Sequence, residues 1–126
     1  MRKGQSNTLA KMINSIKKSK DFKNVYENEK SFATKNLVMY LLKNGDAESN
    51  RLGISVSHKV GNSVVRHLLI RRMREIYRRN LDKIEKGYDI VVIYRMGSDK
   101  KEFFEINEDY IYLCKKHGIL KEEKFD

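Results

Sequence analysis

A long amphipathic helix between two strand-like segments is the feature that most restricts how this chain can fold. Residues 51–57 alternate apolar residues with small or polar ones, which is typical of a strand with one buried face. Residues 61–81 carry apolar residues at helical spacing, with Asn62 as the expected N-cap. Residues 88–95 are a β-branched apolar run, which predicts a buried strand. This order of strand, helix and strand predicts a βαβ unit.

The segments on either side are expected to complete the same fold. Apolar residues at helical spacing predict a short helix over 19–28, and residues 36–43 form a continuous apolar run. A turn after this run would join it to 51–57 as two antiparallel strands. A last helix is expected to begin at Ser98 or Asp99. We therefore predict an α+β fold, an α/β sandwich in which helices pack on a single sheet.

The length of 126 residues fits one domain. We expect the folded α/β domain over 19–117, preceded by a flexible basic leader over 1–18 and followed by a charged tail over 118–126. Lys and Arg number 27 against 17 Asp and Glu, and the net charge of +10 indicates a polyanionic partner.

Several classes of protein do not fit the composition. No stretch approaches the roughly 20 apolar residues of a membrane span, so we expect a cytoplasmic chain with no membrane partner. The single cysteine, Cys114, cannot form an internal disulfide and is interpreted as a buried apolar residue. The 3 histidines lack zinc-like spacing, and the carboxylates are not paired around a His or Ser. We therefore expect no metal site and no catalytic residue in the protein.

The charges of the long helix gather opposite its apolar face. The core face is predicted to be Val65, Leu69, Met73 and Ile76, and the opposite side carries a cationic stripe of His67, Arg71, Arg74 and Arg78. Arg66 borders the stripe, whereas Arg72 and Arg79 fall close to the apolar arc, where periodicity does not place them. Helical charges usually form a solvated face of mixed sign, but like charges at this spacing repel each other. Arginine can bind phosphate through two hydrogen bonds, so the stripe favours a phosphate-bearing partner.

Aromatic residues form a second group. Phe22 and Tyr26 share one helical face, and Tyr40 lies on a neighbouring apolar strand. Single-stranded nucleic acid can stack its bases on such rings. Core packing is the commoner role of an aromatic pair at this spacing, and nothing within the sequence shows that these rings are exposed.

The stretch from Arg51 to Arg66, with the sequence RLGISVSHKVGNSVVR, resembles the protein subunit of bacterial ribonuclease P. The resemblance continues through Arg71, Arg74 and Glu75. It also covers residues 16–26, 37–40 and 86–95, in the order of the family.

The resemblance implies both a topology and a function. The topology is helix and strand in the order αβββαβα, with a left-handed βαβ crossover in place of the usual right-handed one. The function is that of an RNA-binding subunit, which joins a catalytic RNA to remove the 5′ leader from precursor tRNA by Mg²⁺-assisted hydrolysis. The RNA would carry out the chemistry and hold most of the Mg²⁺. The implied partners are the catalytic RNA and precursor tRNA, with no DNA.

Two sets of site residues also follow from the resemblance. The set implied to bind the catalytic RNA is Arg66, His67, Arg71, Arg74 and Lys59. The set implied to bind the single-stranded leader, in a cleft between the first helix and the sheet, is Phe22, Tyr26, Tyr40, Ser31, Lys17 and Lys18. For the three rings, this implied role replaces core packing as our expectation.

The chain departs from the Arg-Asn-Arg signature of the family in the long helix. Arg66 matches the first arginine, but His67 replaces the asparagine and Leu68 replaces the second arginine. Ile70 stands where a polar or basic residue is common. Histidine can still form hydrogen bonds, whereas Leu68 cannot bind phosphate, and Arg72 is a candidate to compensate.

Two other functions remain open on the sequence. A ribosomal or chaperone-like RNA-binding protein would carry the same charge and have no role in cleavage. A protein nuclease would need a carboxylate cluster to hold metal ions. The candidate acids for such a cluster are Glu102, Glu105, Glu108 and Asp109, which the last helix is expected to present as a solvated face.

Overall fold

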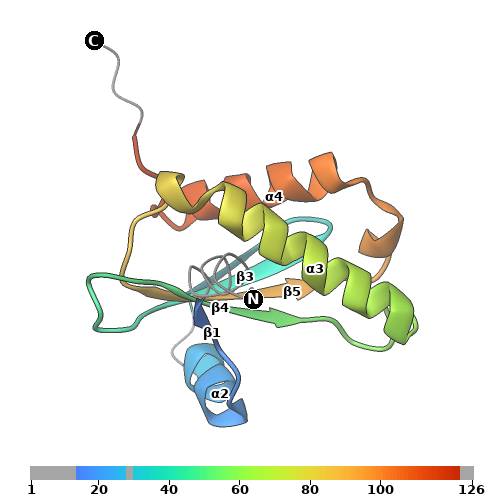
Figure 1. Cartoon of the computed structure of the whole chain (residues 1–126), viewed down its shortest axis with the longest axis horizontal. Helices are drawn as coiled ribbons and strands as arrows, with labels where there is room; N and C mark the ends of the chain where they lie inside the picture. The colour runs from blue at the N-terminus through green and yellow to red at the C-terminus, as the bar shows by residue number, and fades with distance from the viewer. Residues whose placement is uncertain (1–13, 28–29, 123–126) are drawn as a thin grey trace, which may run out of the picture.

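The computed structural model describes residues 14–27 and 30–122, and these form one mixed sheet with helices on both faces. The helices are α2 (Ser19–Glu27), α3 (Ser63–Arg79) and α4 (Phe103–Lys116), with short 3₁₀ helices η1 (Leu81–Lys83) and η2 (Ser98–Lys100). The strands are β1 (Asn14–Ser15), β2 (Lys30–Ala33), β3 (Leu37–Lys43), β4 (Arg51–Ser55) and β5 (Tyr88–Tyr94). Figure 1 shows α2 on one side of the sheet, with α3 and α4 on the other. The predicted α+β architecture and the order αβββαβα are confirmed, with β1 added in front.

The order of the strands corrects one prediction. The sheet runs β1-β4-β5-β3-β2, so β3 and β4 do not pair as a hairpin. Instead β5 lies between them, antiparallel to β3 and parallel to β4. The physical reason is burial, because five of the seven β5 residues are fully buried and both of its faces are covered by helices. A strand that is apolar on both faces is most stable in the centre of the sheet.

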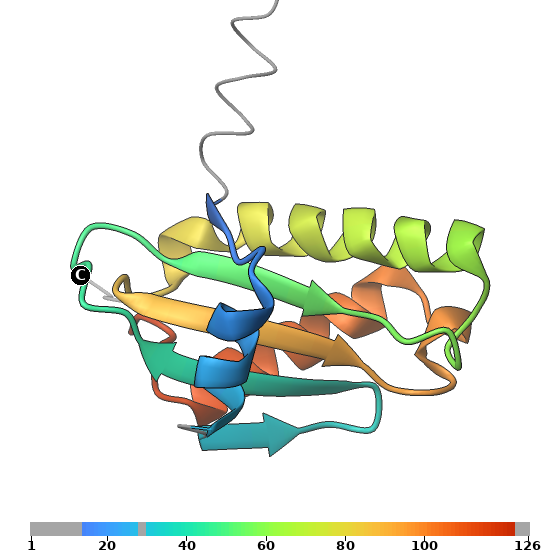
Figure 2. The same ribbon diagram turned by 90° about the horizontal axis from the view of Figure 1, so that it is seen from below.

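The expected βαβ unit is present as β4, α3 and β5. Figure 2 views the sheet from the α2 side, with β4 and β5 both running to the right and β5 below β4. The chain leaves β4, returns through α3 behind the sheet and enters β5. This path is left-handed, as the resemblance implies.

Asparagine residues, Asn62 and Asn80, cap the two ends of the long helix α3. The side chain of Asn62 accepts a hydrogen bond from the backbone N–H of Val65 at 3.0 Å and so caps the first turn of α3. The backbone N–H of Asn80 bonds to the carbonyl oxygens of the last turn. The predicted core face is buried at Leu69, Met73 and Ile76, joined by Tyr77, whereas Val65 is half-buried.

The start of the last helix differs from the expectation. Ser98 and Asp99 lie in η2, and α4 begins at Phe103. Gly97 adopts a left-handed φ of 90°, and the hydroxyl of Ser98 donates to the carbonyl oxygen of Arg95 at 2.5 Å. The hydroxyl of Ser98 is therefore bonded within this tight turn and does not cap α4.

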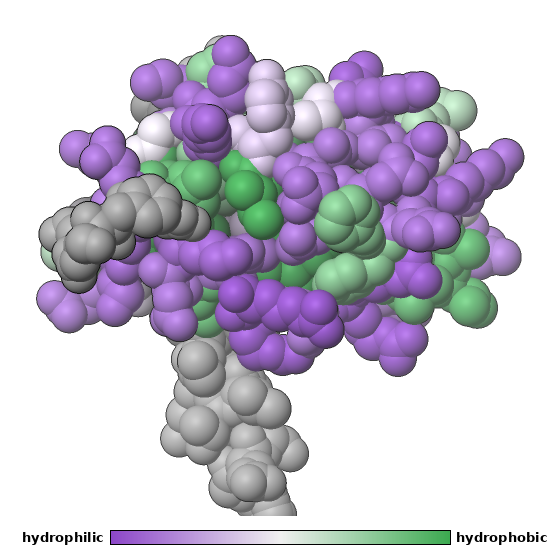
Figure 3. Space-filling view, turned by 90° about the horizontal axis from the view of Figure 1, so that it is seen from above, coloured by the Kyte–Doolittle hydropathy of each residue, from purple (hydrophilic) through white to green (hydrophobic). Residues whose placement is uncertain are grey.

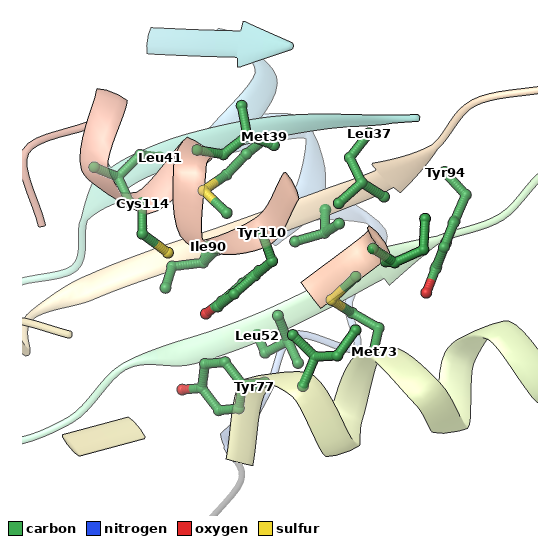
Figure 4. Packing of buried hydrophobic residues seen from close by; sticks show 14 of the residues in the cluster. Leu37, Met39, Leu41, Leu52, Met73, Tyr77, Ile90, Tyr94, Tyr110 and Cys114 are labelled. Atoms are coloured by element: carbon green, nitrogen blue, oxygen red, sulfur yellow. The ribbon is translucent and has the colours of Figure 1, made fainter. Parts of the chain in front are cut away.

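The main core lies between the sheet and the two helices α3 and α4. Figure 4 shows strand residues such as Leu37 and Ile90 meeting Met73 and Tyr110 from the helices. Cys114 is fully buried here, and burial raises the pKa of its thiol to about 12, as suits an apolar role. On the opposite face of the sheet a smaller cluster is built from Ile16, Val25 and Val91.

The fold reaches beyond the expected limits of 19–117 at both ends. β1 pairs with β4, and Ile16, which is 4% exposed, donates its N–H to the carbonyl oxygen of Leu52 at 2.8 Å. At the other end, Ile119 is 1% exposed, and its carbonyl oxygen accepts from the N–H of Glu85 at 2.7 Å. The rest of the expected leader, residues 1–13, and residues 123–126 of the expected tail lie outside the described residues.

Among the described residues, no helix combines the length and the apolar character that a membrane span requires. The cytoplasmic location stays a prediction.

Candidate nucleic-acid interface

A hollow of about 370 Å³ opens between α2 and the sheet. We call it the α2 cleft, and its lining consists of Ser19, Phe22, Lys23, Tyr26, Ile54 and Ser55. The sequence-predicted residues Phe22 and Tyr26 are therefore together at this cleft. Lys23, Ser19 and Ser55 were missed by the sequence reasoning. Lys23 could have been predicted, because it lies one turn before Tyr26 on the same helix. Ser55 could not, because the sequence shows it only as a polar position of an alternating strand.

Three aromatic rings form a row on the α2 side of the sheet, of which Phe22 and Tyr26 line the cleft and Tyr40 does not. The ring centroids of Phe22 and Tyr26 are 6.4 Å apart, and those of Tyr26 and Tyr40 are 5.0 Å apart with their planes at 70°. All three residues are half-buried and pack against the small core cluster. Each ring therefore packs partly against the core and is partly open to solvent. The part that is open to solvent can contact a planar base.

The hydroxyl of Tyr26 stays neutral in this setting. Partial burial and the neighbouring Tyr40 raise the pKa of Tyr26, while a hydrogen bond with Ser55 acts in the opposite direction. A neutral phenol can both donate and accept a hydrogen bond. The cleft therefore offers polar groups beside its stacking surface.

The other residues implied for leader binding lie on β2 and just before α2, outside the lining of the cleft. Ser31 is exposed on β2 and pairs in register with Tyr40, so the two side chains project from the same face of the sheet. Lys17 and Lys18 are exposed just before α2 and are not among the residues that line the cleft. They add positive charge near one end of α2, and their role in binding stays a prediction.

An ionic network that the sequence did not predict fixes α2 to the sheet. Arg51 binds Asp89 through two hydrogen bonds, Nε to Oδ1 at 2.9 Å and Nη2 to Oδ2 at 2.6 Å. Its Nη1 also reaches Asp21 on α2 at 3.3 Å. These bonds, above all those to Asp89, raise the pKa of the Arg51 guanidinium above its usual value. Arg51 thus connects the first turn of α2 with β5 through β4.

The second candidate surface is the outward side of α3. His67, Arg71 and Arg74 are exposed there, and none of them makes an ion pair with a described residue. Lys59 is exposed in the loop before α3. Figure 3, which views the α3 and α4 side, shows hydrophilic side chains over most of this surface. The structure therefore leaves the positive charge of this stripe available to a partner.

Other charged residues of α3 have different surroundings. Arg66 is half-buried, and its Nε is buried without a hydrogen-bond partner among the described residues. Arg78, expected in the stripe, binds Glu75, and so does Arg79 at 2.8 Å from its Nε. Arg72 is half-buried and interacts electrostatically with Tyr94, whose hydroxyl donates to a carbonyl oxygen of α3. The stripe therefore consists of His67, Arg71 and Arg74, with Arg66 beside it.

The acids proposed for a protein nuclease do not form a metal site. Asp109 accepts hydrogen bonds from Thr34 at 3.0 Å and from Asn36 at 2.8 Å, which ties α4 to the turn before β3. Glu102, Glu105 and Glu108 are exposed. Within residues 14–27 and 30–122, no three His, Cys, Asp or Glu side chains gather where they could hold a metal ion.

Known proteins share both the sequence and the fold. Residues 11–118 match the family Ribonuclease P. The chain is 50% identical to the ribonuclease P protein component of Lachnoclostridium phytofermentans, over 91% of this chain and 98% of that relative. The solved RNase P protein of Staphylococcus aureus matches with a TM-score of 0.78 and 32% identity, over 85% of this chain and 97% of that chain. For the RNase P protein from Thermotoga maritima the TM-score is 0.75 and the identity 34%, over 82% and 96%.

These similarities do not favour a ribosomal or chaperone-like protein. The family match spans most of the chain, and the relatives are covered almost completely. The α2 cleft and the cationic side of α3 are thus features of a chain that belongs to the ribonuclease P protein family.

Proposed function

We propose that the chain is the protein subunit of a ribonuclease P, in which it binds the catalytic RNA through α3 and the 5′ leader of precursor tRNA in the α2 cleft. The observation that carries this assignment is a pair of surfaces on opposite sides of one sheet. One is a hollow lined by aromatic rings, and the other is a row of cations that make no ion pair with any acidic residue in the described part of the chain.

The α3 surface suits the backbone of a folded RNA. Arg66, Arg71 and Arg74 each present a guanidinium group that can bind phosphate oxygens through two hydrogen bonds. The Nε of Arg66 is buried and has no hydrogen-bond partner among the described residues, so the exposed side chains of Arg71 and Arg74 are the more accessible of the three. Each phosphate neutralised should contribute roughly −0.7 to −0.9 to the slope of log affinity against log salt concentration.

The α2 cleft suits a single strand of varied sequence. Stacking of a base on an aromatic ring is worth about 1–3 kcal/mol and tolerates any base, because every base has a π-face. Ser55 and the Tyr26 hydroxyl can bind polar groups of the strand, and Lys23 can neutralise a phosphate. A cleft of this kind would accept leaders from many different precursors.

In this assignment the protein positions RNA and neutralises charge, and the catalytic RNA cleaves the bond. We infer that the RNA holds most of the Mg²⁺, because phosphates are typical ligands of this ion and no three His, Cys, Asp or Glu side chains gather among the described residues of the protein. Cations on the protein lower the repulsion between the catalytic RNA and its substrate, which favours their association. The protein thereby raises the affinity for precursor tRNA without supplying a nucleophile or a general base.

Reconstitution tests this proposal. The full chain is mixed with its cognate catalytic RNA, and precursor-tRNA cleavage is measured at low Mg²⁺ against each component alone. We expect the mixture to cleave faster than the RNA alone and the protein alone to be inactive. Binding to the RNA without faster cleavage would instead identify a plain RNA-binding protein, and cleavage by the protein alone would revive the nuclease.

A further inference from the structure

A second hollow lies where the end of α3 meets the start of α4. Its volume is about 250 Å³, and its lining consists of Arg79, Asn80, Lys83, Phe103, Phe104 and Asn107. We call it the α3–α4 pocket. It lies on the other side of the sheet from the α2 cleft, and its volume is below the range of about 300–1,000 Å³ typical of drug-sized ligands. It is suited to a small group such as a single nucleotide.

One wall of the pocket is an exposed aromatic ring. Phe103 is half-buried and packs against the main core, so it has a structural role. Phe104, directly beside it, is 68% exposed and is not part of either core cluster. A phenyl ring that contributes little to the core and borders a hollow is available for stacking.

The pocket is also positively charged. The guanidinium of Arg79 lies over the ring of Phe103, 5.0 Å from its centroid, and its Nε donates to Glu75 at 2.8 Å. Glu75 also binds Arg78, so one carboxylate faces two guanidinium groups. Lys83 is exposed and makes no ion pair with a described residue. A surplus of positive charge therefore remains at the pocket, and an anion is the complementary ligand.

A fixed amide supplies a directional donor. The side-chain nitrogen of Asn80 donates to the carbonyl oxygen of Ile76 at 2.7 Å and to Oδ1 of Asn107 at 3.1 Å. Because its oxygen is used in this bond, the Asn107 amide has its N–H groups left to donate. The pocket thus combines a stacking surface, two cations and a hydrogen-bond donor, which are the groups that recognise a nucleotide.

We propose that the α3–α4 pocket binds one unpaired nucleotide of the catalytic RNA, with its base against Phe104 and its phosphate near Arg79 and Lys83. This inference rests on the proposed function and adds a second contact to it. Arg66 and Arg79 lie 13 positions apart on α3, which corresponds to about 20 Å along a helix. Contacts at both ends of α3 would fix the direction in which the protein lies on the RNA. The leader is excluded as occupant because its cleft faces the opposite side of the sheet.

Binding of the full chain to its cognate catalytic RNA tests the pocket. We expect Phe104→Ala to weaken binding by at least about fivefold, and Phe104→Tyr to restore it, because the tyrosine ring also stacks. Tyr112→Ala is the matched control, since it removes another exposed aromatic side chain of α4, 50% exposed, away from the pocket. Equal affinities for Phe104→Ala and the unmodified chain would overturn the inference.

A crosslinking experiment identifies the occupant. A photoreactive benzoyl-phenylalanine placed at position 104 should crosslink to a defined nucleotide of the catalytic RNA within the reconstituted complex. A crosslink to precursor tRNA, or none in a complex that cleaves normally, would overturn the pocket and leave the proposed function intact. Failure of the unmodified chain to bind the catalytic RNA would overturn both.

Discussion

The ring of Phe22 lies directly on the backbone of Gly53. A Cβ atom added to Gly53 would lie 2.7 Å from Cε1 of Phe22, closer than such atoms approach in proteins. Gly53 is buried in β4, and Phe22 projects from α2. The missing side chain at residue 53 therefore sets how closely α2 approaches the sheet, and with it the shape of the α2 cleft.

Gly53→Ala should destabilise the protein by about 1 kcal/mol, the low end of the cost of extra volume in a packed site, because the new methyl group meets the outer end of the half-buried Phe22 ring, which can shift. The displaced ring should also weaken binding of a single-stranded leader. Urea unfolding and leader affinity measure the two effects. In the double variant with Phe22→Ala, the clash is removed, so the cost of Gly53→Ala should fall well below its value in the unmodified chain. Simple additivity of the two costs would contradict the contact.

Arg66→Ala and Arg71→Ala should weaken assembly with the catalytic RNA, whereas Phe22→Ala should mainly weaken leader binding. The two groups lie on opposite sides of the sheet, so each change should leave the other surface intact. Affinities for the catalytic RNA and for a precursor tRNA with and without its leader separate the effects. Arg78→Ala is the control, because Arg78 already binds Glu75 and should have the smaller effect. Equal losses on both measurements would contradict the separation.

Asp89→Ala should lower the free energy of unfolding by about 2–3 kcal/mol. Removing one partner of a buried ion pair costs about 3–5 kcal/mol, but the side chain of Arg51 is 36% exposed and regains some water. Asp21→Ala removes a longer and more exposed contact of the same arginine and should cost less than about 1 kcal/mol. Denaturant unfolding of the two variants checks this ranking, and a larger effect at Asp21 would contradict it.

His117 should make stability depend on pH. Burial lowers the pKa of His117 below the ordinary 6.5, Lys30 adds to the lowering, and a bond of Nε2 to the carbonyl oxygen of Met39 at 2.9 Å opposes it. As the pH falls below about 6.5, His117 takes up a proton in the unfolded chain, whereas in the folded chain it takes one up only at lower pH. Stability contributed by the neutral ring is therefore complete above that pH and declines as the pH falls toward the lowered value.

Unfolding curves at pH 7.5 and 5.5 measure this effect. His117→Gln keeps a side-chain N–H group but does not titrate, so it should lose less stability between the two pH values than the unmodified chain. His67→Gln removes an exposed histidine and should behave like the unmodified chain. An unchanged pH dependence in His117→Gln would rule out this histidine as the source.

The elements of the fold could be predicted from local patterns, but their pairing could not. The apolar run 88–95 predicts a buried strand, yet the place of β5 between β3 and β4 depends on contacts between distant segments. Sequence proximity favoured the hairpin instead. The left-handed crossover followed from the resemblance alone, because periodicity carries no information on handedness.

The site was predicted in part for similar reasons. Helical periodicity placed His67, Arg71 and Arg74 on the outward side of α3 correctly, but it did not show that Arg78 binds Glu75. The ion pair of Arg51 with Asp89 joins two strands that lie far apart in the chain, and no spacing indicates it. The α3–α4 pocket likewise appears only when the end of one helix meets the start of another.

The sheet separates the α2 cleft from the outward side of α3. With the two surfaces used as proposed, a processed leader would dissociate from one face while the ribonucleoprotein stays assembled through the other. Release of product would then require no disassembly, so a single complex would pass through repeated cycles of turnover.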